Sequence, residues 1–168
     1  MPLSEALRVA LNDQLGNEFQ ASYNYLAMSS WFEAESWDGF ASWMALQSAE
    51  ERVHAMKFYQ YLLDRGAGVS LPALEAPNGE FKTPLDVFEQ SREQEQEVTA
   101  SINRLYKVAI ENDDYATVSF LKWFLDEQVE EEKAVGDMIE KLSRAGENPE
   151  AMMLLDREAG QRVADGEE

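Results

Sequence analysis

The placement of proline constrains the fold of this chain more than any other feature. Its five prolines stand at residues 2, 72, 77, 84 and 149, and the long stretches between them carry apolar residues at helical spacing. Because proline breaks the interior of a helix, these stretches predict helices. We expect four helices of roughly 28 residues each, over about 5–35, 38–65, 84–111 and 115–145, and a short fifth helix from 149 to about 163.

Capping residues mark the starts of these helices. Thr83-Pro84 and Asn148-Pro149 each combine an N-cap with proline at the first helical position. Ser4 followed by Glu5 predicts the first cap, and Asp38 predicts the second. The turn 112–114 separates the third helix from the fourth, and the tail 165–168 is expected to fray.

The lengths of the connections predict the topology. Short turns imply that the first helix pairs antiparallel with the second, and the third with the fourth. Residues 66–83 have turn chemistry and no sustained period. At ~3.3 Å per residue they can cover about 60 Å, which is enough to travel the whole length of helices about 40 Å long. We therefore predict an all-α four-helix bundle with a long crossover between helices 2 and 3. Residues 1–168 are expected to form a single domain.

The composition excludes several classes of function. With 33 acidic and 14 basic residues the net charge is −19, so nucleic acid and membrane surfaces are poor partners and cations are good ones. The chain has no cysteine and one histidine, which rules out disulfides, thiolate metal sites and any mechanism needing two imidazoles. Residues 1–8 lack a signal peptide pattern, and we expect a cytoplasmic protein.

The inward stripe of each long helix is apolar near its ends and acidic near its middle. Glu18, Glu51, Glu95 and Glu131 take these central positions, and an antiparallel bundle brings them to one level. Several ionised carboxylates in a core would be forced to take up protons unless a counter-charge is present. Arg92 is the only basic residue on these stripes, so metal cations are the remaining candidate.

Glu51 and His54 strengthen the metal hypothesis. They form Glu-x-x-His, which places an oxygen and a nitrogen ligand on one helical face, as in di-iron bundles. Oxygen-rich sites with one imidazole suit iron or manganese, and zinc by affinity alone. Taken singly, Glu18 has a simpler interpretation as a surface residue and His54 as a hydrogen-bonded structural histidine. The combination on four helices at matched depth favours the metal site.

These residues closely resemble the non-haem ferritins of the prokaryotic type. The resemblance covers nearly the whole chain, through the segments NEFQASYNY (17–25), EERVHA (50–55), Glu95 and FLKWFLDEQVEEEK (120–133). It implies an iron-storage ferritin, a hollow homo-oligomeric shell of 24 subunits. Such a ferroxidase oxidises Fe(II) with dioxygen or peroxide and stores Fe(III) as a mineral.

The resemblance also assigns roles to single positions. It implies one iron held by Glu18, Glu51 and His54, and a second held by Glu51 as a bridge with Glu95 and Glu131. Gln128 matches a glutamine near the second iron, Tyr25 a tyrosine beside the centre, and Trp123 an aromatic near it. A third iron position matches Glu50, Glu127 and Glu130. Arg52 stands where haem-binding relatives carry methionine, so no haem is expected.

Three other classes of protein compete with this interpretation. A di-iron carboxylate oxidase acting on an organic substrate would need an apolar pocket beside the metals and usually a second histidine. A purely structural bundle conflicts with the aligned core carboxylates. A DNA-protecting mini-ferritin would lack the fifth helix, and this chain has no basic tail.

Overall fold

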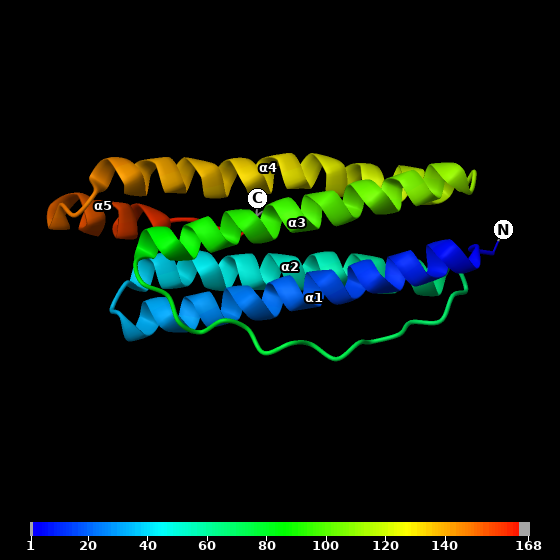
Figure 1. Cartoon of the computed structure of the whole chain (residues 1–168), viewed down its shortest axis with the longest axis horizontal. Helices are drawn as coiled ribbons and strands as arrows, with labels where there is room; N and C mark the ends of the chain where they lie inside the picture. The colour runs from blue at the N-terminus through cyan, green and yellow to red at the C-terminus, as the bar shows by residue number, and fades with distance from the viewer. Residues whose placement is uncertain (1, 165–168) are drawn as a thin grey trace.

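Four long helices lie side by side and a short fifth helix packs against one end of the group (Figure 1). The computed structural model describes residues 2–164. Their helices are α1 (Glu5–Ala34), α2 (Asp38–Asp64), α3 (Pro84–Glu111), α4 (Tyr115–Ala145) and α5 (Pro149–Ala159). The predicted all-α bundle and its crossover are confirmed, and the expected fraying of 165–168 lies outside the described residues.

Most helices begin where the capping pattern predicts. The side chains of Ser4, Thr83, Asp114 and Asn148 each accept a hydrogen bond from a backbone N–H in the first turn of their helix. These bonds pair amides that a helix start otherwise leaves without an intrahelical acceptor.

One predicted cap and one predicted boundary are wrong. Asp38 does not cap α2: it is the first helical residue, and the capping position is held by Trp37, which makes no side-chain bond. The acceptor comes from elsewhere, because Asp156 Oδ1 of α5 receives the N–H of Phe40 at 2.9 Å. Helix α5 ends at Ala159, earlier than the expected 163. The residue after its last turn is Gly160, which lies close to Gly39 of α2. Glycine has a low helix propensity, so the helix does not continue through it.

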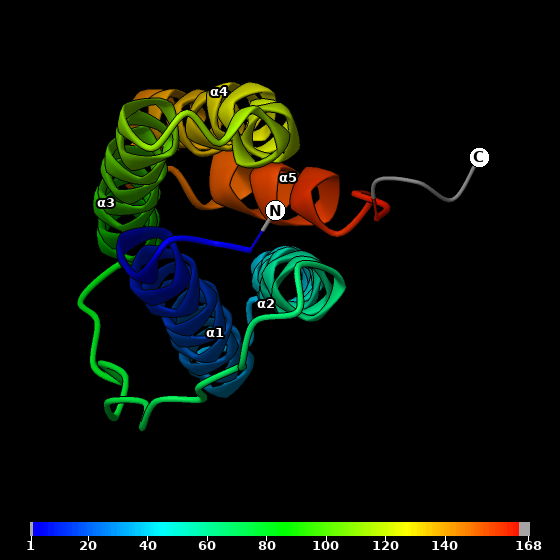
Figure 2. The same cartoon turned by 90° about the vertical axis from the view of Figure 1, so that its right-hand side faces the viewer.

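The bundle is built from two antiparallel hairpins, α1 with α2 and α3 with α4, as the short turns predict. The hairpins touch along α1 and α3. On the other side, among the described residues, no Cα of α2 lies within 8 Å of a Cα of α4. Helix α5 lies between these two helices and contacts both (Figure 2).

The crossover runs along the bundle over α1, and side chains of α1 hold it in place (Figure 1). The amide of Asn12 accepts from Ser70 N at 2.6 Å and donates to Gly68 O at 3.1 Å. Two turns further, the amide of Gln20 accepts from Glu75 N at 2.7 Å and donates to Glu75 O at 3.1 Å. Between them Gly16 has no side chain, and Pro72 occupies the space.

The apolar core is divided into two clusters along the bundle. One gathers around Phe32, Phe40 and Phe88, and the other around Leu11, Phe58 and Ile102. The level between them contains the buried acidic and amide side chains. The fold therefore presents a polar layer closed on both sides by packed apolar residues. No helix in residues 2–164 has a stretch long and apolar enough to span a membrane.

Candidate metal centre

The four predicted core carboxylates all lie in the polar layer of the bundle. Each comes from a different long helix and each is almost fully shielded from solvent: Glu18, Glu51, Glu95 and Glu131 are between 0% and 4% exposed. His54, one turn from Glu51 on α2, is 3% exposed. Helical spacing fixes this arrangement, because each residue sits on the inward stripe of its helix near the middle.

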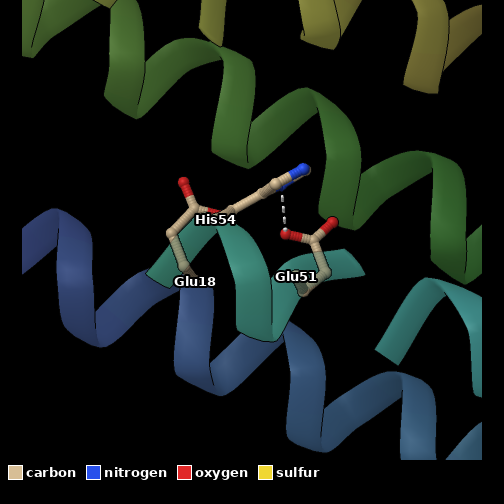
Figure 3. Close-up of side chains that lie close together, drawn as sticks. All are labelled: Glu18, Glu51 and His54. Carbon is tan, nitrogen blue, oxygen red and sulfur yellow. Dashed lines mark hydrogen bonds and ion pairs between the residues drawn. The ribbon is translucent and has the colours of Figure 1, made fainter. Parts of the chain in front are cut away.

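Glu18, Glu51 and His54 form a compact group (Figure 3). Each offers one ligand atom, and these atoms lie within 4.8 Å of one another. His54 Nδ1 lies 3.2 Å from Glu51 Oε2. Three donor atoms from two neighbouring helices thus converge on one point, which a cation of the size of Fe²⁺ or Zn²⁺ can occupy.

A second group lies beside the first and shares its histidine. His54, Glu127 and Glu131 offer ligand atoms within 4.8 Å of one another, and His54 Nε2 is 3.8 Å from Glu127 Oε1. In this structure His54 is the residue common to both groups, whereas the resemblance gives that position to Glu51. Glu95 belongs to neither group. Both of its carboxylate oxygens accept hydrogen bonds from neighbouring side chains.

Amide and phenol groups hold the carboxylates in place. Gln14 donates to Glu18 Oε1 at 2.8 Å, and Gln47 donates to Glu131 Oε2 at 2.8 Å. Sequence reasoning gave neither glutamine a role. Gln14 carried a weak signal, since it precedes Glu18 by one helical turn on the same face. Gln47 precedes Glu51 by one helical turn on the same face of α2, but its partner on α4 could not be read from the sequence.

Tyr25 and Gln128 hold the Glu95 carboxylate in place in the same way. The Tyr25 hydroxyl donates to Glu95 Oε1, and Gln128 Nε2 donates to Glu95 Oε2 at 3.2 Å. Tyr25 is fully buried and Gln128 is 3% exposed. The structure therefore brings both predicted residues to the centre through Glu95.

Burial of this layer changes the protonation of its groups. Loss of solvation raises the pKa of Glu18 to about 7 and that of Glu131 to about 8, and the charge of Glu95 adds to both rises. Burial also raises the pKa of Glu51 well above its usual range, and raises that of Glu95. For His54 burial lowers the pKa to about 4, with a contribution from the Lys57 ammonium. Without a cation the layer is therefore suited to hold protons and a neutral imidazole.

Unpaired oxygen atoms test whether a metal ion fits these residues. Among the described residues, Glu18 Oε2 and Glu51 Oε1 are buried side-chain atoms with no hydrogen-bond partner. A buried carboxylate oxygen without a partner is costly, and a cation between the two would satisfy both. The donor set of carboxylate oxygens with one imidazole suits iron, so the residues present fit the ion that the sequence predicts.

The residues predicted for a third iron do not form a compact group like the two above, with ligand atoms within 4.8 Å of one another. Glu127 is half-buried near His54. Glu50 is half-buried and pairs with Arg162 at 2.7 Å. Glu130 is exposed. The three predicted residues do not meet in one group here.

Trp123, predicted near the centre, packs its ring edge-on against His54, with centroids 5.3 Å apart.

Comparison with known proteins agrees with this geometry. A family model for the ferritin-like domain matches residues 9–145. The bacterial non-heme ferritin of Staphylococcus aureus is 44% identical over 165 residues, which is 98% of this chain and 99% of the relative. An open-pore ferritin from the archaeon Archaeoglobus fulgidus superposes with a TM-score of 0.95 at 40% identity, covering 97% of this chain and all of that one. An engineered closed form of the Archaeoglobus fulgidus ferritin has the same TM-score at 41% identity, covering 96% and 99%.

Proposed function

Since the chain belongs to the ferritin family, we propose that it stores iron and that its polar layer is a ferroxidase centre. The observation that carries this proposal is the set of four buried carboxylates and one buried imidazole at a single level of the bundle. Such a layer binds Fe(II) in place of protons, and hard carboxylate oxygens favour Fe(III) over Fe(II). The centre therefore promotes oxidation of the metal that it binds.

The proposed ligands divide between two iron ions. Glu18, Glu51 and His54 hold the first. Glu131 contributes to the second with Glu51 and Glu95, once Glu95 exchanges a hydrogen bond for the metal. Gln14, Gln47, Tyr25 and Gln128 are positioning residues, because each donates to a carboxylate and limits its rotation. A third iron position at Glu50, Glu127 and Glu130 is a further proposal, and no haem is expected.

The electron balance explains why two irons are needed together. Each Fe(II) gives one electron, so a pair supplies the two that reduce dioxygen to hydrogen peroxide, or peroxide to two water molecules, with two protons taken up. Carboxyl groups with raised pKa hold protons at neutral pH and release them when iron binds. Hydrolysis of the Fe(III) product then frees protons as the mineral forms.

We further propose a homo-oligomeric shell, with 24 subunits as the expected number, in which the whole chain is one domain. Met153 and Leu154 support this proposal because they are 65% and 63% exposed on α5, and a helix in solution gains nothing from such exposure. Met152 and Leu155 instead pack on the bundle. Dioxygen and peroxide are the proposed oxidants, and a cytoplasmic location stays a prediction.

Anaerobic titration with Fe(II) followed by oxygen tests the proposal. We expect fast oxidation of about two irons per subunit, as a two-metal centre requires, and slower oxidation of any further iron. Fast turnover that saturates at one iron, or no fast phase, would contradict it.

A di-iron oxidase acting on an organic substrate receives less support. It needs an apolar pocket beside the metals, and two cavities of about 590 and 600 Å³ lie elsewhere, between α1, α3 and the crossover. Neither cavity is lined by His54 or by any of the four core carboxylates. Addition of small organic substrates should therefore leave the rate of iron oxidation unchanged.

A further inference from the structure

Arg162 lies against the acidic layer although it comes from the far end of the sequence. Its Nη2 is 2.7 Å from Glu50 Oε2, and the two side chains are 19% and 13% exposed. The guanidinium carbon lies 4.5 Å from the centre of the Trp43 ring. Glu50 precedes Glu51 directly, so a positive charge that belongs to the chain itself stands beside the proposed iron ligands.

Helix α5 fixes the segment that carries this arginine. Asp156 accepts the N–H of Phe40 at the start of α2. Gly39 lies so close to α5 that a β-carbon built on it would be 1.6 Å from Asp156 O. Beyond α5 the N–H groups of Gln161 and Arg162 bond to Glu158 O and Ala159 O. The chain from 156 to 162 is therefore a strap that starts at residue 39 of α2 and reaches residue 50, across the side where α2 and α4 stand apart (Figure 2).

The contact between Arg162 and Glu50 is weak enough for a metal ion to replace the arginine. A guanidinium can bind a carboxylate through two parallel N–H bonds, but here Nη1 is buried with no hydrogen-bond partner in residues 2–164. The pair thus makes less than the full set of bonds and leaves one donor desolvated, which costs free energy. The arginine charge also acts on Glu131, where it opposes the rise in the pKa of that carboxyl.

We propose that Arg162 is a tethered counter-cation: it occupies Glu50 while the third iron position is vacant and must leave when a third metal ion binds there. Arg162 is thus a positioning residue that sets the affinity of this position without touching the first two irons. The inference rests on the proposed function, since it takes the neighbouring centre to be a two-metal site with a third position at Glu50. It predicts that binding of a third ion and release of the strap are one event.

Calorimetric titration of the whole assembled protein with Zn²⁺ tests the affinity. Zinc takes oxygen and nitrogen ligands and does not change its oxidation state. We expect Arg162→Gln to tighten the third binding step by about tenfold, the value of one charge-assisted hydrogen bond. The first two steps should change much less, because the arginine is bonded to Glu50 and to none of their proposed ligands. Arg162→Lys keeps the charge and should stay near the wild type. Arg157→Gln is the matched control, because Arg157 lies exposed on α5 and carries the same charge.

A combined variant separates this effect from general loosening of α5. In the double variant that combines Arg162→Gln with Glu50→Gln, the tightening of the third step should disappear. The carboxylate that the loss of the arginine makes available to the metal ion is then absent. Equal changes in Arg157→Gln and Arg162→Gln, or a third step that no Arg162 variant alters, would overturn the inference. Failure of the proposed function looks different: the wild type would then lack the two tight zinc steps.

Hydrogen–deuterium exchange gives a second measurement that does not depend on affinity. In the wild type, the amides of residues 160–164 should stay protected with two zinc ions per subunit and exchange faster when a third is added. In Arg162→Gln they should exchange fast from the beginning. Protection that is unchanged by the third ion in the wild type would contradict the coupling between strap and metal.

Discussion

Among single residues, Glu51 and Glu130 offer the sharpest contrast. Glu51 is fully buried in the compact group with Glu18 and His54, whereas Glu130 is exposed on α4. We expect Glu51→Ala to slow the first turnover of iron oxidation by at least about a hundredfold, because a ligand proposed for both ions is lost. Glu130→Ala should leave the first turnover nearly intact and alter later ones.

Stopped-flow absorbance of Fe(III) formation, over successive additions of Fe(II), measures both effects. Equal losses in the two variants would show that Glu130 does not belong to a separate third position.

Tyr25 is placed to give up an electron as well as to orient a ligand. Its hydroxyl donates to Glu95 Oε1, so Glu95 is in position to receive the phenol proton when the ring is oxidised. We expect rapid-freeze paramagnetic resonance, after oxygen is added to the Fe(II)-loaded protein, to show a tyrosyl radical that Tyr25→Phe lacks. The variant keeps the volume of the ring, so iron affinity should change little.

A wild type without the radical, or a variant with an identical one, would leave Tyr25 only the role of orienting Glu95. Tyr23→Phe is the control, since Tyr23 is on the same helix and 43% exposed.

The level of the carboxylates could be predicted from the sequence because helical spacing is local information. Once the helix limits are known, the inward stripe brings Glu18, Glu51, Glu95 and Glu131 to one layer. Contacts between distant segments were not predictable in this way. The pair of Gln47 with Glu131, and that of Arg162 with Glu50, depend on how α2, α4 and α5 pack, which no spacing within one helix reveals.

At the scale of elements, the position of the crossover depends on its close contact with α1. A methyl group added at Gly16 would come within 2.7 Å of Pro72 Cγ, so Gly16→Ala must push the crossover away from α1. We expect a loss of about 1–3 kcal/mol in the free energy of unfolding and faster hydrogen exchange in residues 68–75. Denaturant unfolding and exchange mass spectrometry measure the two effects.

Gly68→Ala is the matched control, because nothing lies within 4 Å of a β-carbon there. If both variants unfold alike, the close approach of Pro72 to α1 contributes nothing to stability. The helix limits in this region were predictable from proline. The contacts between α1 and the crossover were not, since Asn12 and Gln20 have the sequence character of ordinary exposed amides.

At the scale of the whole molecule, the acidic layer makes stability depend on pH in an unusual direction. Burial raises the pKa of Glu18 to about 7 and that of Glu131 to about 8 in the folded state, from an ordinary value of 4.5. The folded protein therefore binds more protons than the unfolded chain, and its stability falls as pH rises through this range. His54, with its pKa lowered to about 4, acts with the opposite sign but only below 6.5.

Between pH 6.5 and pH 8 the carboxyl groups act without the histidine. We expect the metal-free protein to lose stability there, by about 1.4 kcal/mol per pH unit for each extra proton bound. Zn²⁺ should restore the stability at pH 8, since the ion replaces the protons. Calorimetric Tm values measured in chelator and in zinc check both statements, and Glu18→Gln with Glu131→Gln should flatten the profile. A Tm that rises over this interval without metal would contradict the assignment.

Assembly is the second property at this scale. We expect the wild type to sediment as one large closed species, and Met153→Glu with Leu154→Glu to yield smaller ones with unchanged helix content, because two exposed apolar side chains of α5 become charged. Glu150→Gln, in the first turn of the same helix, should assemble normally. A wild type that is a monomer or dimer at physiological salt would refute the shell.

The division of the bundle into two hairpins also governs when the centre comes into being during synthesis. Glu18, Glu51 and His54 all belong to the first hairpin, and Glu95 and Glu131 to the second. Chains emerge from the ribosome with the N-terminal part first, so a nascent chain that ends before α3 holds the ligands proposed for one ion but only Glu51 of those proposed for the second. If the layer is the proposed ferroxidase centre, its two-electron chemistry has to wait for the last long helix, and an unfinished subunit cannot begin to oxidise iron in pairs.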